Sequence, residues 1–181
     1  MDGSSPNSIE TPVGRQGRRD EVASLDALLD LKAQGKVRFI GMSGTLPNLE
    51  EQIEMGVFDV FQIPYSALER KHEELITRAS QAGAGIVIRG GAARGAPTKE
   101  GGDSWELWQE AHLDDLLDGM TRMEFILRFT CSHPDLDTTI VGTLNMDHLR
   151  ENMRALERGP LDPGTYEEAK HRLAAAGSRP A

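Results

Sequence analysis

The sequence has few of the residues that form disulfides, metal sites or membrane spans. Its 181 residues include one cysteine, Cys131, so neither an internal disulfide nor a thiolate zinc cluster can form. No run of about 18 apolar residues is present, which argues against a membrane span. Residues 1–20 are polar and rich in Gly, Pro and Ser, and they lack the apolar centre of a signal peptide. From these absences we expect a cytoplasmic protein without a metal site.

The charge balance is acidic. Asp and Glu number 29 against 20 Lys and Arg, which gives a formal net charge of −9. This argues against nucleic acid and against an anionic membrane surface as partners. A small anionic ligand remains possible, because a few local hydrogen-bond donors are enough to hold one.

Apolar residues recur in a pattern that predicts alternating helices and strands. After a helix that begins near Val22 and ends at Gly35, we expect strands at 37–43, 57–63, 85–89 and 138–142. Helices are expected at 49–55, 73–82, 105–117, 120–132, 146–157 and 166–176. The predicted organisation is a flexible leader at 1–20, one domain at 21–176 and a tail at 177–181.

Strands this short and apolar, separated by helices, predict an α/β fold with parallel strands covered on both faces. Two architectures fit: an open doubly wound sheet, or part of a (β/α)₈ barrel. The Gly-x-Gly-x-x-Gly motif of dinucleotide-binding doubly wound folds does not follow the first strand. This favours the barrel.

One strand-to-helix junction, Thr139-Ile-Val-Gly-Thr-Leu-Asn-Met-Asp-His-Leu-Arg-Glu-Asn152, is the most specific segment. An apolar strand ends at Gly142, a polar turn follows, and a helix carries Glu151 and Asn152 in its second turn. Unpaired N–H groups at a helix N-terminus favour an anion.

This segment and three others resemble the aldo-keto reductases, in order and in spacing. They are Gly35-Lys-Val-Arg-Phe-Ile-Gly-Met-Ser43, Phe58-Asp-Val-Phe-Gln-Ile63 and, for the seventh strand and its loop, Gly85 to Gly95. The resemblance covers Val22 to the C-terminus and implies a parallel half-barrel, strands five to eight of a TIM (β/α)₈ barrel, with an extra C-terminal helix. The family's catalytic Asp, Tyr, Lys and His lie in the first four units, so no catalytic residue is carried over.

The resemblance also implies a partial NAD or NADP site. Ser43 and Gln62 match the residues that hold the nicotinamide carboxamide, while Gly44 replaces the usual asparagine. Arg89 replaces the tyrosine that stacks on the nicotinamide ring. The remaining expected cofactor-binding residues are Gly90, Gly91 and Gly95 at the pyrophosphate, Gly142, Thr143 and His148 near the adenosine phosphates, and Glu151 and Asn152 at the adenine. A lysine is frequent at position 142 and an arginine at 148, so the resemblance does not imply a strict NADP preference.

Several alternatives stay open. Arg89 could instead pair with a carboxylate such as Glu124, and Tyr65 near the mouth is the one candidate for a replacement proton donor. The leading function is an NAD(P)H-dependent oxidoreductase of the aldo-keto reductase class, reduced to its cofactor-binding half. The alternatives are a non-catalytic nucleotide-binding or self-assembling protein and, less favoured, a new hydrolytic activity of Glu69, Glu73, Asp103, Glu106 and Glu110.

Strand pleat predicts an uncovered apolar face. Alternate residues share one face of a strand, so the residues grouped with the site side chains are Val37, Phe39 and Gly41 with Ser43, Phe58 and Val60 with Gln62, and Gly85 and Val87 with Arg89. An open sheet with such a face and with unpaired edges is unstable in water. We therefore expect a homodimer, a complementary half-barrel or a rearranged helix such as 105–117 to cover it, and the homodimer is the simplest of these.

Overall fold

The computed structural model describes residues 24–92, 97–98 and 102–181, and the chain divides into two compact units, Met1–Ile40 and Gly41–Ala181. In the first unit, residues 24–33 form a helix. Gly35 follows it with φ +70°, and the Lys36 N–H donates to the Leu31 carbonyl at 3.0 Å. This is a Schellman ending, and it confirms the predicted helix end at Gly35.

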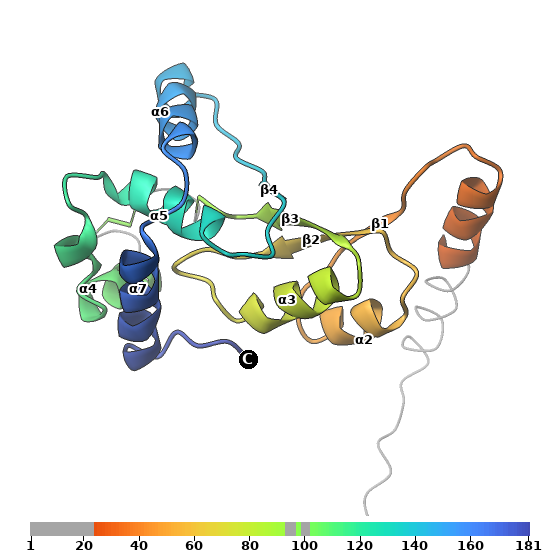
Figure 1. Ribbon diagram of the computed structural model, residues 1–181, viewed down its shortest axis with the longest axis horizontal. Coiled ribbons are helices and arrows are strands. Elements are labelled where there is room, and N and C mark those ends of the chain that lie inside the picture. Colours follow the sequence, from red (N-terminus) through yellow and green to blue (C-terminus); the bar gives the residue numbers. More distant parts are fainter. Residues whose placement is uncertain (1–23, 93–96, 99–101) are drawn as a thin grey trace, which may run out of the picture. The chain divides into compact units, whose positions relative to one another are not determined.

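In the second unit, four parallel strands form one sheet in the order β1-β2-β3-β4 (Figure 1). They are β1 (Gly41–Ser43), β2 (Val60–Pro64), β3 (Gly85–Arg89) and β4 (Thr138–Thr139). The α/β prediction is confirmed. A doubly wound sheet reverses its strand order at a switch point, whereas this order is sequential and corresponds to an arc of a (β/α) barrel.

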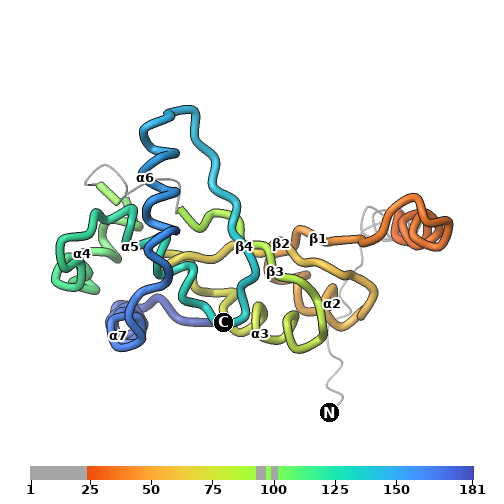
Figure 2. Tube along the Cα trace, turned by 45° about the horizontal axis from the view of Figure 1, so that its top comes forward, coloured from red at the N-terminus to blue at the C-terminus, as the bar shows by residue number. Residues whose placement is uncertain are grey.

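Six α-helices and one 3₁₀ helix are described in this unit. They are α2 (Leu49–Glu54), α3 (Glu73–Gln81), α4 (Asp103–Glu110), η1 (Leu113–Leu116), α5 (Arg122–Cys131), α6 (Met146–Glu157) and α7 (Pro163–Ala175). Both α2 and α3 run along the same side of the sheet (Figures 1 and 2). No helix among the described residues is long and apolar enough to cross a bilayer.

The two faces of the sheet differ in burial. On the face covered by helices, Phe61, Ile63, Ile86 and Ile88 are 0–2% exposed. On the opposite face, Val60, Gln62, Val87 and Arg89 are only half-buried. The predicted division between the two faces of β2 and β3 is therefore confirmed.

Phe58 is an exception to that prediction. It lies before the strand rather than in it, and its ring contacts Phe61 of the covered face edge-on, with centroids 5.7 Å apart. Because β2 begins only at Val60, strand alternation does not extend back to Phe58. The expectation that Phe58 shares the face of Gln62 is wrong.

The outer strands are shorter than predicted. Pairing of β1 with β2 covers only Gly41 to Ser43, and that of β4 with β3 covers only Thr138 and Thr139. Each outer strand has one strand partner among the described residues. Both central strands continue beyond these ladders, to Pro64 in β2 and to Arg89 in β3.

The helix predicted at 105–117 is broken in two. His112 takes a left-handed conformation with φ 48°, and η1 starts at the next residue. Trp108 and Leu113 are both fully buried, and the Trp108 indole N–H donates to Asp114 at 2.9 Å. A continuous helix would place these two residues on different faces, so the chain turns to bury both.

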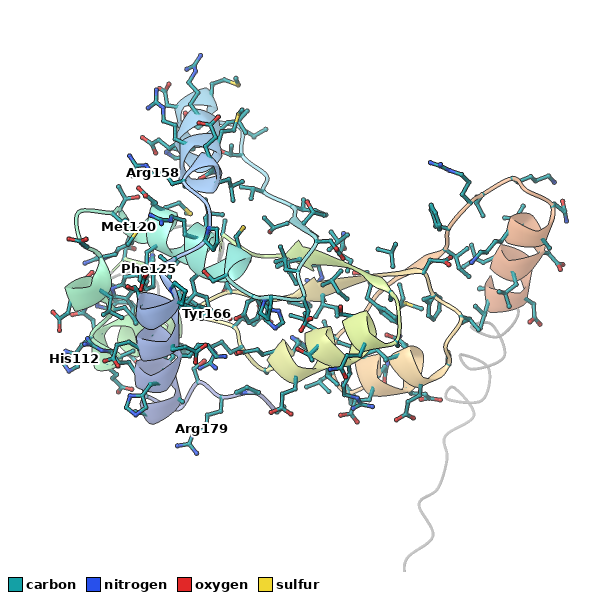
Figure 3. The ribbon with its side chains drawn as sticks, viewed as in Figure 1. His112, Met120, Phe125, Arg158, Tyr166 and Arg179 are labelled. Carbon is teal, nitrogen blue, oxygen red and sulfur yellow. The ribbon has the colours of Figure 1, made fainter. Side chains whose placement is uncertain are left out.

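Aromatic side chains from α4, α5 and α7 pack together in the core. The Trp108 and Phe125 rings meet edge-on with centroids 5.7 Å apart, and Phe129 meets Tyr166 at 4.9 Å. Phe125 on α5 and Tyr166 on α7 are labelled in Figure 3. Edge-to-face pairs of this kind add to the free energy gained by burying the rings. This cluster fixes α7 beside the helices that follow the sheet.

Candidate functional site

Two side chains that we predicted to bind the cofactor lie next to each other at the carboxyl ends of β1 and β2. Ser43 and Gln62 are register partners, and the Ser43 hydroxyl donates to Gln62 Oε1 at 3.1 Å. The Gly44 N–H donates to the Gln62 carbonyl at 3.2 Å. Strand pairing thus places a hydroxyl and a carboxamide together at the rim of the uncovered face.

Arg89 is the last residue of β3 and lies opposite Pro64. Its Nε atom is buried and has no hydrogen-bond partner among the described residues. The alternative pairing with Glu124 is wrong: no ion pair joins the two among the described residues, and Glu124 instead accepts from Arg158 at 2.7 Å and from Arg128 at 3.4 Å. The guanidinium thus retains an unused donor at the same end of the sheet as Ser43 and Gln62.

The strand-to-helix junction after β4 borders a cavity of about 570 Å³. Five of the predicted cofactor residues line it: Gly142, Thr143, His148, Glu151 and Asn152. The turn is held locally, since the Asn145 N–H donates to the Thr143 hydroxyl at 3.1 Å, and the Asn145 side chain caps α6 by accepting from the Asp147 N–H at 2.9 Å. The first turns of α6 are thereby fixed beside the cavity.

Five further residues line this cavity that the sequence analysis did not assign to the cofactor: Ala92, Thr121, Arg122, Met123 and Val141. Thr121 caps α5 and accepts from the Glu124 N–H at 3.1 Å. The sequence Thr121-Arg-Met-Glu124 is a capping-box signature, so it could have located this helix start. That the start of α5 faces α6 across a cavity is not visible in the sequence.

Arg122 is held in place at the cavity wall. It makes a bidentate contact with Asp114 at 2.8 and 2.9 Å, and its guanidinium lies 4.8 Å from the Trp105 ring centroid. The hydrogen bonds from Arg122, opposed by partial burial, lower the pKa of Asp114. The guanidinium therefore joins α4 and η1 to the wall of the cavity.

The glycines after β3 lie in different surroundings. Gly90 is exposed, whereas Gly91 is buried and its carbonyl accepts from Thr130 at 3.0 Å. Neither is among the residues that line the cavity, although Ala92 is. Gly95 lies outside the described residues.

Tyr65 is not at the mouth of the sheet, which corrects its assignment as a replacement proton donor. Its side chain is 0% exposed, and its hydroxyl lies 3.0 Å from that of Tyr166. Burial, together with the neighbouring Tyr166, raises the pKa of Tyr65 far above its usual value. A phenol that is enclosed and hard to ionise cannot exchange protons with a substrate at the rim.

The carboxylates considered for hydrolysis do not form one site. Glu73 is buried and paired with Arg70 at 2.7 Å and Lys170 at 2.9 Å. The Glu69 Oε1 atom lies 3.7 Å from Lys71 Nζ. The other three carboxylates, Asp103, Glu106 and Glu110, belong to α4. No group of three or more His, Cys, Asp or Glu among the described residues is placed to bind a metal.

The fold and the rim residues define a half-barrel of the type seen in the aldo-keto reductases, and comparison with known proteins agrees. A sequence profile of the Aldo/keto reductase family matches residues 18–171. The chain belongs to this family.

Among its relatives, the "uncharacterized oxidoreductase YqkF" of Bacillus subtilis is 25% identical over an alignment of 164 residues, and the match covers 81% of this chain and 53% of that protein. The aldo-keto reductase AKR11C1 of Bacillus halodurans, in its apo form, superposes with a TM-score of 0.75 at 23% identity. That comparison covers 97% of this chain and 61% of AKR11C1. Its holo form gives a TM-score of 0.74 at 24% identity, with 97% and 58% covered. The chain thus spans little more than half the length of these relatives.

Proposed function

We propose that this chain binds the nicotinamide dinucleotide, NAD(P)H, of an aldo-keto reductase that reduces carbonyl compounds. The observation that carries the proposal is the Ser43–Gln62 hydrogen bond at the carboxyl ends of adjacent parallel strands. Family membership makes a nicotinamide cofactor the expected ligand. Ligands of such sheets bind at the carboxyl ends of the strands.

The nicotinamide end of the ligand would lie at β1 to β3. A carboxamide needs both donors and acceptors, and the Gln62 amide together with the Ser43 hydroxyl offers both. The unused Nε donor of Arg89 lies at the end of the next strand. A guanidinium can also stack on a π face, so Arg89 suits the rim position given to it by the resemblance.

The adenosine end would occupy the cavity between α5 and α6. Gly142 and Thr143 bring backbone close to the first turn of α6, where the free N–H groups favour phosphate oxygens. Asn152 is 6% exposed and lines the cavity together with exposed Glu151. Their amide and carboxylate suit the amino edge of an adenine.

When bound, the cofactor would supply a hydride to the carbonyl carbon. This chain would orient the nicotinamide through Ser43 and Gln62 and hold the phosphates at the β4–α6 junction. Carbonyl reduction also needs a proton donor. Neither tyrosine of the sequence is placed to act as one, because Tyr65 and Tyr166 bond to each other in the core. We therefore propose that another segment supplies the proton.

Calorimetric titration of the chain with NADH and NADPH tests the proposal. Ser43→Ala combined with Gln62→Ala should weaken binding of both about 10-fold or more, as the loss of two hydrogen bonds predicts. Leu68→Ala, in the turn after β2 and outside both the Ser43–Gln62 pair and the cavity lining, serves as the control. If the unaltered chain binds neither dinucleotide, only the assembly alternative remains.

We further propose that a second copy covers the exposed sheet face. β1 and β4 each leave one edge unpaired within the described part of the chain, and the two edges of a parallel sheet can pair reciprocally about a two-fold axis. Beside β4, Ile140 is 51% exposed, and α6 presents Met146 and Met153 at 59% and 53%. An unpaired strand edge and exposed apolar side chains each favour association.

Light scattering after size-exclusion chromatography gives the molar mass that tests this assembly. A dimer that Met153→Glu weakens, and that Glu157→Lys on the same helix does not, is the expected result. A well-folded monomer overturns the proposal. A chain that dimerises only with a separately encoded first half also overturns it and identifies the other partner.

A further inference from the structure

Helix α6, which follows the last strand of the sheet, has an apolar stripe that is largely exposed. Four apolar residues recur at i, i+3, i+7 and i+10, so they lie along one side of the helix: Met146, Leu149, Met153 and Leu156. Leu149 is half-buried and the other three are exposed. Asn152 and Ala155 form the buried side of α6, which packs against α5. The stripe, which we call the α6 stripe, therefore has no cover within the described part of the chain.

A second helix with uncovered apolar residues precedes the sheet in sequence. This leucine helix, residues 24–33, carries Leu25, Leu28 and Leu29 at i, i+3 and i+4, so they share one side of it. Leu28 and Leu29 are exposed. At a rise of 1.5 Å per residue, the leucine helix is about 15 Å long and α6 is about 18 Å long. The two apolar sides therefore match in length.

The charges beside these two apolar sides are opposite in sign. Asp26 and Asp30 are four residues apart and lie next to the leucines on the surface of the leucine helix. Arg150 and Arg154 are also four residues apart and lie next to the α6 stripe. All four side chains are exposed. An acidic margin on one helix can thus face a basic margin on the other.

Three charged residues near the two helices do not follow this pattern, and none of them cancels it. Lys32 is half-buried near the end of the leucine helix. Asp147 pairs with Arg150 at 2.8 Å, but an exposed ion pair of this kind contributes little. Glu157 lies in the last turn of α6. Arg154 makes no ion pair with another described residue, so its charge remains available.

The dimer proposed above needs a contact besides its sheet edges. Ladders of three residues in β1 and two in β4 contribute little to the roughly 1,200 Å² that a stable interface buries. A two-fold axis that pairs β4 with β1 of a second copy also brings together the chain after β4 and the chain before that β1. Residues 34–40 connect the leucine helix to β1, and they span at most about 25 Å when extended.

We propose that the leucine helix of a second copy covers the α6 stripe, with Asp26 and Asp30 facing Arg150 and Arg154. This inference rests on the proposed dimer and names the surface that holds it. The two-fold axis makes the contact occur twice, once in each direction. Burial of the leucines and methionines supplies the attraction, and the charges select the partner and the register.

Reversing the charges on each side separately tests the contact. Asp26→Lys with Asp30→Lys places like charges on both sides, and so does Arg150→Glu with Arg154→Glu. Each double variant should raise the dimer dissociation constant, measured by analytical ultracentrifugation, about 10-fold or more. An equimolar mixture of the two should form a heterodimer about as tight as the unaltered dimer, because both contacts then join opposite charges again. Recovery in the mixture also shows that both variants fold.

The matched control is Glu106→Lys with Glu110→Lys on α4. These residues are also exposed and four apart, and their reversal changes the net charge as much as Asp26→Lys with Asp30→Lys does. It should leave the dissociation constant unchanged. A dimer that neither reversal at the proposed contact weakens would overturn the inference and leave the proposed dimer standing. Weakening without recovery in the mixture would also overturn it, whereas a monomeric unaltered chain would show that the proposed dimer itself fails.

Discussion

The hydroxyl groups of Tyr65 and Tyr166 lie 3.0 Å apart in the core, 101 residues apart in sequence. Tyr65 directly follows β2, and Tyr166 lies on α7. The pair therefore ties the C-terminal helix to the end of the sheet. Both tyrosines of the sequence therefore contribute to packing in the core.

Removing one of these hydroxyls should destabilise the fold without affecting the rim. Tyr166→Phe leaves the Tyr65 hydroxyl buried without its partner, so we expect the free energy of unfolding to fall by about 1–3 kcal/mol. The cost of Tyr65→Phe should be similar, and that of the double variant should be less than the sum. Urea denaturation measures these values. Dinucleotide binding should be unchanged in Tyr65→Phe, and a loss of binding by a folded variant would contradict its placement in the core.

A buried cation anchors three segments. Arg70 is 4% exposed and donates to Glu73 at 2.7 Å, to the Lys170 carbonyl at 3.0 Å and to the Ser178 carbonyl at 3.1 Å. Arg70→Ala removes these bonds and leaves Glu73 with Lys170 as its remaining ion-pair partner. The free energy of unfolding should therefore fall by about 3–5 kcal/mol.

The paired variant Arg70→Met with Glu73→Gln removes both charges while keeping side-chain volume. It should be more stable than Arg70→Ala in the same denaturation experiment. An Arg70→Ala protein as stable as the parent would show that the charge cluster contributes nothing to the docking of α7.

Stability should fall on mild acidification because two histidines are buried. Burial lowers the pKa of His72 and of His133. His72 accepts from the Leu46 N–H through Nε2 at 3.2 Å, a bond that requires the neutral ring. Below the unfolded pKa of about 6.5, the unfolded chain binds more protons than the folded chain.

This difference in bound protons decides in which direction stability changes with pH. The stability contribution is fully present above about pH 6.5 and is lost as the pH falls toward the lowered folded values, by up to about 1.4 kcal/mol per pH unit for each histidine. Urea denaturation at pH 7.5 and 5.5 should show this loss, with a smaller loss in His72→Gln. An identical pH dependence in His72→Gln would show that His72 titrates normally.

The turn after β4 has room for a positive charge. Apart from its chain neighbours, no atom of the described residues lies within 4 Å of the position of a Cβ on Gly142, and the residue lines the cavity proposed for the adenosine phosphates. Gly142→Lys should therefore fold normally and raise the affinity for NADPH relative to NADH about 5- to 10-fold, as one additional charge-assisted contact predicts.

The matched control is Gly142→Ala, which adds the Cβ without the charge and should leave the NADPH/NADH affinity ratio unchanged. The gain in Gly142→Lys should shrink at high salt, since exposed charges are screened. Equal gains for both dinucleotides would place residue 142 away from the 2′-phosphate.

The local sequence determined the bounds of those helices and strands that begin and end at capping residues or glycines. Helix α6 has the predicted bounds because Asn145 caps it and its apolar spacing is regular, and β3 has the predicted bounds because Gly83 and Gly90 enclose a short apolar run. The resemblance pointed to Ser43 and Gln62, which share a hydrogen bond, and to the β4–α6 junction, which borders the cavity. Their role toward a cofactor stays a prediction.

Tertiary structure decided the features that depend on partners distant in sequence. The break at His112 follows from burying both Trp108 and Leu113. The lengths of β1 and β4 are set by how many residues pair with the neighbouring strand, and the apolar runs in the sequence are longer. Tyr65 lies in the core, where its hydroxyl meets that of Tyr166, and the Gln52 amide packs against Gly44 because that residue has no side chain. Sequence periodicity assigns a residue to a face, but packing between elements decides which side chains meet there.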